Sequence, residues 1–340
     1  MKTHAIIPVF IPHEGCPHDC IFCNQKAITA RTESPTMQET EKLIERNLRT
    51  IEANPHIKTK EIAFYGGSFT AIPMERQTAY LEIAERFKKE GRIDKIHMST
   101  RPDYIDGKIL DNLKAHGTDI IELGVQSFDP EVLRRSARGH TAEDVYKASD
   151  LIKSYGIELG IQLMTGLPSD TYEKCMYSAE QTVKIAPAIA RIYPAVVLEN
   201  TAMCRMYRRG EYVPPDLKQS VMTVKDMYRL LKDAGINVIR IGLKSTDIIK
   251  SEDGAVVGGY HPAFRQLVES EIAREDLEGQ LDGGTRGRVR FISNPVSFSN
   301  MVGNKASNRK YFAAKYPDLD IRFETDIRLE PFVYKAVTEE

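Results

Sequence analysis

The stretch Gly15-Cys16-Pro17-His18-Asp19-Cys20-Ile21-Phe22-Cys23 places three cysteines in a C-x3-C-x2-C frame. Thiolates this close in sequence can converge on one metal centre, and soft sulfur ligands select iron–sulfur clusters, zinc or copper(I). A structural zinc site closes with four ligands, whereas a [4Fe–4S] cluster held by three cysteines leaves one iron open for a cofactor or substrate. The spacing therefore predicts an iron–sulfur cluster on Cys16, Cys20 and Cys23.

Two other interpretations of this cysteine motif remain open. His13 or His18 could supply a fourth ligand and make a small zinc knuckle, or the three cysteines could be ordinary buried thiols. The remaining cysteines, Cys175 and Cys204, stand alone in the sequence. An odd count of five with three clustered is typical of a metal site rather than a disulfide framework, and it predicts a reducing, cytoplasmic setting.

Length and composition describe an ordinary globular chain. It has 340 residues, of which 41% are hydrophobic and 28% charged, and its formal net charge is −1. No apolar run approaches the ~20 residues that span a bilayer, and the first residues lead into a strand rather than a signal peptide. We therefore expect no membrane contact. A near-neutral charge gives no general attraction to nucleic acid, so any such contact must come from a local basic patch.

Apolar strand-like runs alternate with helical repeats along most of the chain. A capping box at Thr36 and Glu39, an Asp129-Pro130 start and a cap at Thr141 mark the beginnings of three helices. Alternating strands and helices predict a parallel sheet with right-handed crossovers. Six strands are too few for a closed eight-stranded barrel. We therefore predict an α/β fold, a partial (β/α)6 barrel. Its strands are expected at 5–11, 61–65, 93–99, 119–125, 157–164 and 190–198. A further helix at 217–234 and a short strand at 237–241 follow.

The last ~80 residues are expected to form a small α+β unit. We divide the chain into a barrel domain, 1–245, and a C-terminal accessory domain, 246–340, because residues 245–259 are polar and contain glycine. Within the second part, basic side chains accumulate near Tyr311 and Phe312. They are Arg286, Arg288, Arg290, Lys305, Arg309, Lys310 and Lys315. This segment is either a nucleic-acid face with stacking aromatics or a solvated helix whose aromatics belong to the core.

Distinctive residues follow the predicted strands, at the end where ligands collect in parallel α/β sheets. Each signal has a structural explanation of its own: a tight turn, a surface turn, a helix cap or a buried amide that needs hydrogen-bond partners. Because these segments follow the cysteine loop in sequence, one after each predicted strand, they indicate a single site. The segments are Tyr-Gly-Gly-Ser-Phe at 65–69, Ser-Thr-Arg-Pro-Asp at 99–103, Leu-Gly-Val-Gln-Ser at 123–127, Arg-Gly-His-Thr at 138–141 and Gln-Leu-Met-Thr-Gly-Leu-Pro at 162–168.

The cysteine spacing, with Phe22 before the last cysteine, resembles the cluster motif of the radical S-adenosyl-L-methionine (SAM) enzymes. The strand-end segments in series resemble more specifically the radical SAM domain of the elongator catalytic subunit family, over about residues 4–245. Tyr193-Pro194, Asn200-Thr201 and the run 207–212 continue this likeness. The anaerobic coproporphyrinogen oxidases are similar more distantly.

The resemblance implies a cofactor arrangement. The open iron of the [4Fe–4S] cluster would bind SAM, and one electron, from a low-potential donor such as flavodoxin or ferredoxin, would cleave it to a 5′-deoxyadenosyl radical. In this alignment, the turn at Gly66, Gly67 and Ser68, together with Arg101, would hold the amino acid end of SAM. Further contacts fall on Ser99, Gln126, Arg138 and Gln162. The elongator family acts on tRNA, so the substrate is expected to be RNA, tRNA or a nucleotide.

This sequence departs from the elongator pattern in several places. Its first two cysteines are closer together, Gln162 replaces an aspartate that binds the ribose, and Ser99 stands where coproporphyrinogen oxidases have a glutamate. No acetyltransferase domain is expected, because only the run 303–309 is faintly similar to an acetyl-CoA loop. A small-molecule oxidase or decarboxylase of the coproporphyrinogen type is therefore the alternative enzyme. A zinc- or cluster-binding adaptor without catalysis is the alternative of another class.

Overall fold

The computed structural model describes residues 3–12, 16, 19–24, 33–243, 255–258, 260–282 and 284–339. Its centre is a parallel seven-stranded sheet that curls into a half-barrel, in the order β1-β2-β3-β4-β5-β6-β8. The strands are β1 (His4–Ile11), β2 (Thr59–Gly66), β3 (Lys95–Thr100), β4 (Ile120–Gln126), β5 (Glu158–Thr165), β6 (Ile189–Pro194) and β8 (Asn237–Ile241). The predicted α/β partial barrel is confirmed, and the short strand after the sixth unit completes its sheet.

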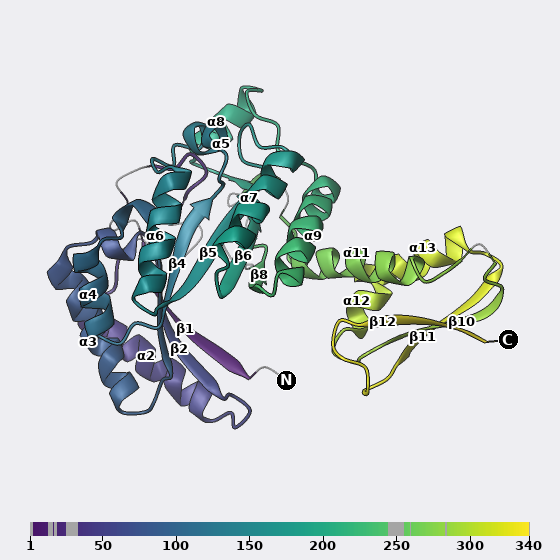
Figure 1. Ribbon diagram of the computed structural model, residues 1–340, viewed down its shortest axis with the longest axis horizontal. Helices are drawn as coiled ribbons and strands as arrows, with labels where there is room; N and C mark the ends of the chain where they lie inside the picture. The colour runs from purple at the N-terminus through teal and green to yellow at the C-terminus, as the bar shows by residue number, and fades with distance from the viewer. Residues whose placement is uncertain are drawn as a thin grey trace.

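Helices cover the outer face of this sheet (Figure 1). They are α2 (Met37–Glu52), α3 (Met74–Lys89), α4 (Gly107–Ala115), α6 (Ala142–Ser154), α7 (Tyr172–Ile185) and α9 (Leu217–Asp233). Their apolar sides bury one face of the strands, as Leu48, Phe64 and Leu123 illustrate by their near-zero exposure. Two short helices, α5 (Pro130–Arg135) and α8 (Ala202–Arg208), lie beyond the strand ends instead (Figure 1, top).

The predicted helix starts are present. Thr36 and Glu39 form a reciprocal capping box at the start of α2, and Thr141 and Asp144 form another at α6. Asp129 caps α5 with its side chain, and proline follows at the first helical position. Each cap satisfies amide groups that have no partner inside the helix. None of the helices in the described ranges combines the length and apolar character needed to cross a membrane.

The prediction of one continuous strand over 190–198 is wrong. β6 ends at Pro194, and the amide of Ala195 still donates to the carbonyl of Thr165. The chain then forms β7 (Val196–Leu198), which pairs antiparallel with β9 (Ala255–Gly258) in a separate two-stranded sheet. Proline has no N–H to continue a ladder, so it is a natural end for an interior strand.

The C-terminal part contains a three-stranded sheet in the order β11-β10-β12. Its strands are β10 (Gly287–Ser293), β11 (Leu319–Thr325) and β12 (Tyr334–Glu339), and its helices are α11 (Phe264–Glu278), α12 (Phe298–Val302) and α13 (Ser307–Lys315). A 3-10 turn, η3 (Asn304–Ala306), precedes α13, and Lys305 and Ala306 in it adopt positive φ angles. Strand β12 and helix α12 were not predicted.

Helix α11 links this C-terminal sheet to the half-barrel (Figure 1). It packs against α9, where Lys225 pairs with Glu275 and Arg229 with Asp276 at 2.6 Å. Its other side contributes Leu277 to the C-terminal core. The boundary predicted between residues 245 and 246 falls outside the described residues, as do most of 245–259, and it stays a prediction.

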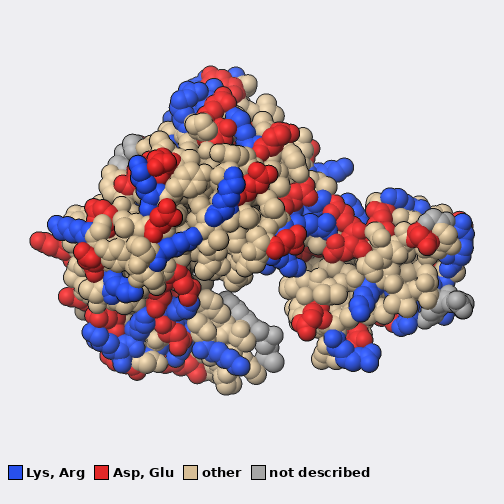
Figure 2. Space-filling view, in the orientation of Figure 1, with Lys and Arg blue, Asp and Glu red and all other residues tan. Residues whose placement is uncertain are grey.

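The structure supports the second interpretation of the basic C-terminal segment. Phe312 is fully buried in the C-terminal core, and the hydroxyl of Tyr311 donates to Glu278 at 2.9 Å. Arg288 pairs with Asp320 and Arg290 with Glu324. Figure 2 shows basic and acidic side chains interspersed on this part of the molecule. Phe312 therefore cannot stack on a nucleobase, which contradicts that part of the first interpretation.

Candidate functional site

The glycine pair at the end of β2, Gly66 and Gly67, holds this strand against the end of β1. Gly66 has a φ of +120°, and a Cβ atom there would lie 2.6 Å from the carbonyl oxygen of Ile11. The amide of Gly67 donates to the same oxygen at 2.8 Å. The backbone of this turn therefore lies close to the strand that leads into the cysteine loop, and the contact of the glycine pair with SAM stays a prediction.

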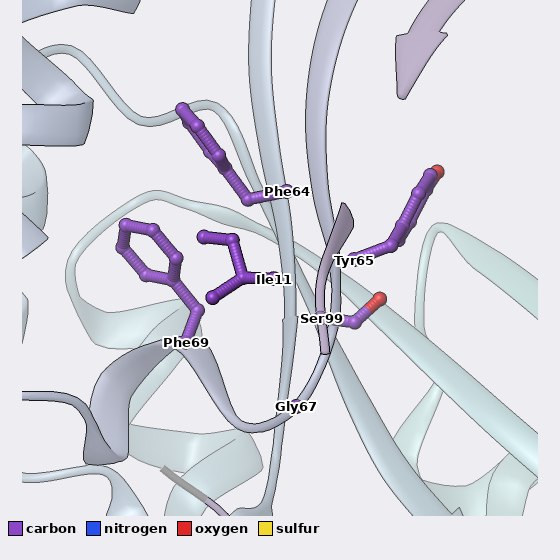
Figure 3. A pocket seen from close by; sticks show the side chains of 6 residues that line it. All are labelled: Ile11, Phe64, Tyr65, Gly67, Phe69 and Ser99. Carbon is purple, nitrogen blue, oxygen red and sulfur yellow. The ribbon is translucent and has the colours of Figure 1, made fainter. Parts of the chain in front are cut away.

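A small hollow opens beside this turn (Figure 3). Ile11, Phe64 and Phe69 gather on one side of it, while the hydroxyl groups of Tyr65 and Ser99 point to the other. The hydroxyl of Ser99 donates to Glu122 on β4 at 3.0 Å. Two polar groups from neighbouring strands therefore mark the inner face of the half-barrel at this end.

Ser68 is committed to contacts within the chain. Its hydroxyl lies 2.8 Å from that of Thr100 and accepts a hydrogen bond from the amide of Arg101. Thr70 completes the cluster with a hydroxyl 2.5 Å from that of Thr100. These bonds tie the turn after β2 to the end of β3, so that the two predicted SAM-binding segments are fixed relative to each other.

Arg101 fixes a neighbouring turn in the same way. Its guanidinium makes a bidentate contact with Asp103 at 2.8 and 2.9 Å and donates to the carbonyl oxygen of Arg138 at 2.6 Å. The side chain is only 4% exposed. The predicted contact between Arg101 and a SAM carboxylate stays a prediction, and the visible role of this residue is to position Arg138.

Arg138 connects the sheet with the cysteine loop. One terminal nitrogen donates to the sulfur of Cys20 at 3.1 Å, and the other donates to the carbonyl oxygen of Gly124. Its Nε atom is buried and has no hydrogen-bond partner in the described part of the chain. A guanidinium beside this sulfur places positive charge next to an atom that would bind a metal as a thiolate.

The amide of Gln126, at the end of β4, meets that of Gln162 within β5. Gln162 donates to the side-chain oxygen of Gln126 at 3.0 Å, and Gln126 has a φ of +70° at a bulge in β4. A Cβ at Gly124 would lie 3.0 Å from the Gln126 side chain and 3.4 Å from that of Arg138. The glycine therefore makes room for two of the predicted SAM contacts, Gln126 and Arg138.

The cysteine loop is anchored between the two short helices at the strand ends. The amide of Ile21 donates to the carbonyl of Ser136 after α5, and its carbonyl accepts from Met203 in α8. Ile21 and Phe22 pack against an apolar cluster that includes Met203 and the lone thiol of Cys204. Burial raises the pKa of the Cys204 thiol, with the charge of Glu199 adding to the effect, so Cys204 is a packing residue.

The cysteines Cys16, Cys20 and Cys23 are all half-buried at this edge. In the described ranges, no three side chains of the metal-binding types lie close enough together to hold an ion. The alternative ligands His13 and His18 fall outside those ranges. The donor set, three thiols with one next to a guanidinium, nevertheless fits an iron–sulfur cluster, and the assignment of the three ligands stays a prediction.

His140 gives the site a measurable pH dependence. Burial, followed by the charges of Arg138 and Arg101, lowers the pKa of His140 to about 3. The unfolded chain binds a proton near the ordinary value of 6.5 while the folded chain does not, so stability falls as the pH drops below that value. We expect this residue to contribute up to about 1.4 kcal/mol per pH unit between the two values. Urea unfolding of the wild type and His140→Leu across this window measures it. The expectation is contradicted if the free energy of unfolding depends on pH in the same way in both proteins.

Several polar side chains of the inner wall were not predicted as site residues. They are Glu61, Tyr65, His97, Glu122, Arg191 and Tyr193, and they form contacts across β2, β3, β4 and β6. Glu122 and Arg191 are both charged residues inside otherwise apolar strands. That pattern is the one signal that could have identified them, because an ionised group is almost never buried without a partner.

The comparison with protein families gives two matches. The radical SAM superfamily matches residues 10–181, and a radical SAM C-terminal domain matches residues 187–274, beyond the predicted boundary at 245. A tRNA uridine(34) acetyltransferase of Methanocaldococcus jannaschii is 28% identical over 247 residues, which cover 62% of this chain and 46% of that protein. The heme chaperone HemW of Bacillus subtilis is 22% identical over 61% of this chain and 55% of its own length.

The fold has a counterpart among solved structures. The archaeal Elp3 of Methanocaldococcus infernus, solved with an N-terminal deletion, superposes with a TM-score of 0.65 at 23% identity, over 81% of this chain and 64% of that one. The chain spans about half the length of the archaeal acetyltransferases that it matches. The first family match alone covers half of this chain, and the observed half-barrel agrees with it. The chain therefore belongs to the radical SAM superfamily.

Proposed function

We propose that this protein is a radical SAM enzyme whose cluster is held by Cys16, Cys20 and Cys23. The single observation that carries the proposal is the contact of Arg138 with both the Cys20 sulfur and the Gly124 carbonyl, because it joins the cysteine loop to the predicted SAM contacts. When bound, the cluster and SAM would together supply a 5′-deoxyadenosyl radical that abstracts hydrogen from a substrate.

The residues of the chain would bind and orient these groups. The turn at Gly66 and Gly67 and the paired amides of Gln126 and Gln162 would contact SAM. Gly124 keeps the space between them open. The half-barrel wall limits access of water to the reacting atoms, which protects a reactive species. A low-potential reductant such as flavodoxin or ferredoxin would supply the electron.

For the substrate we propose RNA, of the tRNA class. The names of the archaeal relatives support this. The two helices that anchor the cysteine loop also carry exposed arginines, and they are Arg134 and Arg135 in α5, Arg205 and Arg208 in α8, and Arg209 directly after it. Glu199 and Glu211 pair with two of them, so this rim carries an excess of positive charge. Phosphate contacts from arginine supply sequence-independent affinity for RNA.

The test is release of 5′-deoxyadenosine from SAM by anaerobically reconstituted protein, with and without tRNA transcripts. We expect Cys20→Ala to abolish release, because the cluster loses a ligand. Cys175→Ala is the matched control. Its thiol lies in α7 and donates to Asp170, so this variant should keep the activity.

Each outcome of this assay separates one interpretation from the others. Release that tRNA stimulates at moderate salt supports both the chemistry and the substrate. Release indifferent to RNA contradicts the RNA proposal and favours a small-molecule oxidase or decarboxylase, in keeping with the similarity to HemW. Protein that binds about one zinc and no sulfide is instead an adaptor with a closed structural site.

A further inference from the structure

A groove opens on the outer side of the half-barrel, between the beginnings of α7 and α9. Its volume is about 740 Å³, within the range of about 300–1,000 Å³ that is typical of pockets for small ligands. Its lining comes mainly from residues 165–172 after β5, residues 211–215 after α8 and the beginning of α9. Both helices begin at the end of the half-barrel where α5 and α8 lie (Figure 1). None of the predicted SAM contacts lines this groove.

One wall of the groove is an aromatic ring that is held in place. Tyr172, the first residue of α7, is 48% exposed, and its hydroxyl donates to Asp226 on α9 at 3.2 Å. Burial and the charge of Asp226 raise the pKa of this phenol, so the hydroxyl keeps its proton and its hydrogen bond at neutral pH. A ring that is half-exposed and fixed in orientation is a platform on which a planar group can stack.

Prolines form much of the remaining wall. Pro168 follows β5, and Pro214 and Pro215 precede α9. Gly166 allows Pro215 to lie against the segment after β5, because a Cβ atom at Gly166 would come within 2.8 Å of the proline ring. Tyr212 donates a hydrogen bond to the carbonyl of Gly166 beside this contact. These contacts join the two segments, so the groove is formed without a ligand.

Arg135, at the end of α5, is the charged residue of the lining that is left available. It forms no ion pair or hydrogen bond within the described ranges. The two carboxylates of the lining are engaged. Glu211 accepts two contacts from Arg209 at 2.6 and 2.8 Å, and Asp170 accepts hydrogen bonds from the backbone of its own turn and from the thiol of Cys175. An anion can therefore approach the guanidinium of Arg135.

Arg135 also connects the groove with the cysteine loop. It directly precedes Ser136, whose carbonyl accepts the amide of Ile21. Arg134 on α5 and Arg205 on α8 are exposed as well, and neither has an ion pair in the part of the chain that the structure describes. A row of phosphates that follows these arginines would pass both the groove and the cysteine loop.

We propose that this groove binds one unstacked nucleotide of the RNA substrate, with its base on the ring of Tyr172 and its phosphate on Arg135. The choice of RNA rests on the proposed function, to which the groove adds a subsite. Because the groove lies outside the sheet, the bound nucleotide is a neighbour of the reacting one and fixes the position of the strand. Every base can stack on an aromatic ring, so this subsite contributes affinity rather than sequence specificity.

An acidic peptide of a partner protein is the alternative occupant, since a carboxylate could also pair with Arg135. The available arginines continue from the groove along α5 and α8, however. A phosphate backbone carries a charge on every nucleotide and can use all of these arginines together. The arrangement therefore favours a nucleic acid strand.

The experiment measures binding of a fluorescently labelled tRNA transcript by anisotropy at several salt concentrations. It uses reconstituted protein without SAM, so that affinity is recorded without turnover. Tyr172→Ala removes the stacking ring and should weaken binding about tenfold. Tyr177→Ala is the matched control and should leave binding unchanged. Tyr177 lies on the same helix and is 43% exposed, but it does not line the groove.

Three further variants separate the ring, the charge and the space. Tyr172→Phe keeps the ring and should bind tRNA within about twofold of the wild type. Arg135→Gln should weaken binding and reduce the slope of log affinity against log salt by about one, because one phosphate contact is lost. Thr223→Trp fills the groove from α9 and should weaken binding. It decides the question if Tyr172→Ala fails to fold.

The proposal is overturned if the wild type binds tRNA but Tyr172→Ala binds it as tightly as Tyr177→Ala, or if Tyr172→Phe is as weak as Tyr172→Ala. An unchanged salt slope in Arg135→Gln contradicts the phosphate contact. If the wild type does not bind tRNA at moderate salt, the groove takes no nucleotide, and the peptide is favoured instead. Failure of the proposed radical chemistry would look different, because release of 5′-deoxyadenosine would be absent while Tyr172-dependent binding of tRNA persisted.

Discussion

Gly66→Ala is expected to lower the free energy of unfolding by about 3–5 kcal/mol and to reduce iron loading during anaerobic reconstitution. The φ of +120° is accessible to glycine but strained for alanine. The added Cβ would also meet the carbonyl oxygen of Ile11 at 2.6 Å. This oxygen accepts the amide of Gly67, so the clash separates β1 and β2 where the cysteine loop begins. Urea denaturation and iron analysis measure the two effects.

Gly91→Ala is the matched control for this prediction. Gly91 also has a positive φ, +70°, but a Cβ there would meet no atom within 4 Å. Only the left-handed backbone is then penalised, by about 1–2 kcal/mol, and iron loading should not change. A Gly66→Ala protein as stable as Gly91→Ala, with normal iron content, would show that the turn does not control the cysteine loop.

The strand and helix alternation was predictable because its signals are local. The capping box at Thr36 and Glu39 and the apolar stripe that follows lie within a few turns of each other, and the structure confirms both. The end of β6 at Pro194 could have been predicted from the proline itself. β12 was harder to predict, because Lys335, Val337 and Thr338 stay exposed and the strand is defined by its pairing with β10.

The candidate site was predictable only as a list of residues. The contact between Arg138 and Cys20 joins positions 118 residues apart, and that between Gln126 and Gln162 spans 36. Such pairs depend on strand register, which places Gln162 beside both Gly124 and Arg191. Ser68 and Arg101 are engaged within the chain, which motif order could not reveal.

The inner wall shows most directly what the sequence leaves undecided. Glu122 lies in β4 and Arg191 in β6, both otherwise apolar strands, and β5 separates these two strands in the sheet. Because β5 between them carries Gly160 opposite Glu122, the arginine can reach across to the carboxylate. The sequence indicates that each charge needs a partner, but only the curled sheet identifies it.

Arg191→Met should therefore be among the most destabilising substitutions, lowering the free energy of unfolding by about 3–5 kcal/mol at neutral pH. Arg191 lies 2.7 Å from Glu122, which is 1% exposed, and donates to the hydroxyl of Tyr65 at 2.5 Å. Its guanidinium also lies 4.8 Å from the centre of the Tyr65 ring. Methionine fills similar volume, so the main loss is the uncompensated charge on Glu122. Urea denaturation at fixed pH measures it.

A double variant and a surface control distinguish this cause from packing. Glu122→Gln combined with Arg191→Met removes both charges, and it should recover a large part of the stability, since the cost of a broken buried pair comes from the charge left behind. Arg86→Met breaks an exposed pair with Glu41, where both side chains are nearly half exposed, and should cost less than about 1 kcal/mol. If the double variant is as unstable as Arg191→Met alone, the charge pair with Glu122 is not the main contribution. The arginine then stabilises the wall through its contacts with the hydroxyl and the ring of Tyr65.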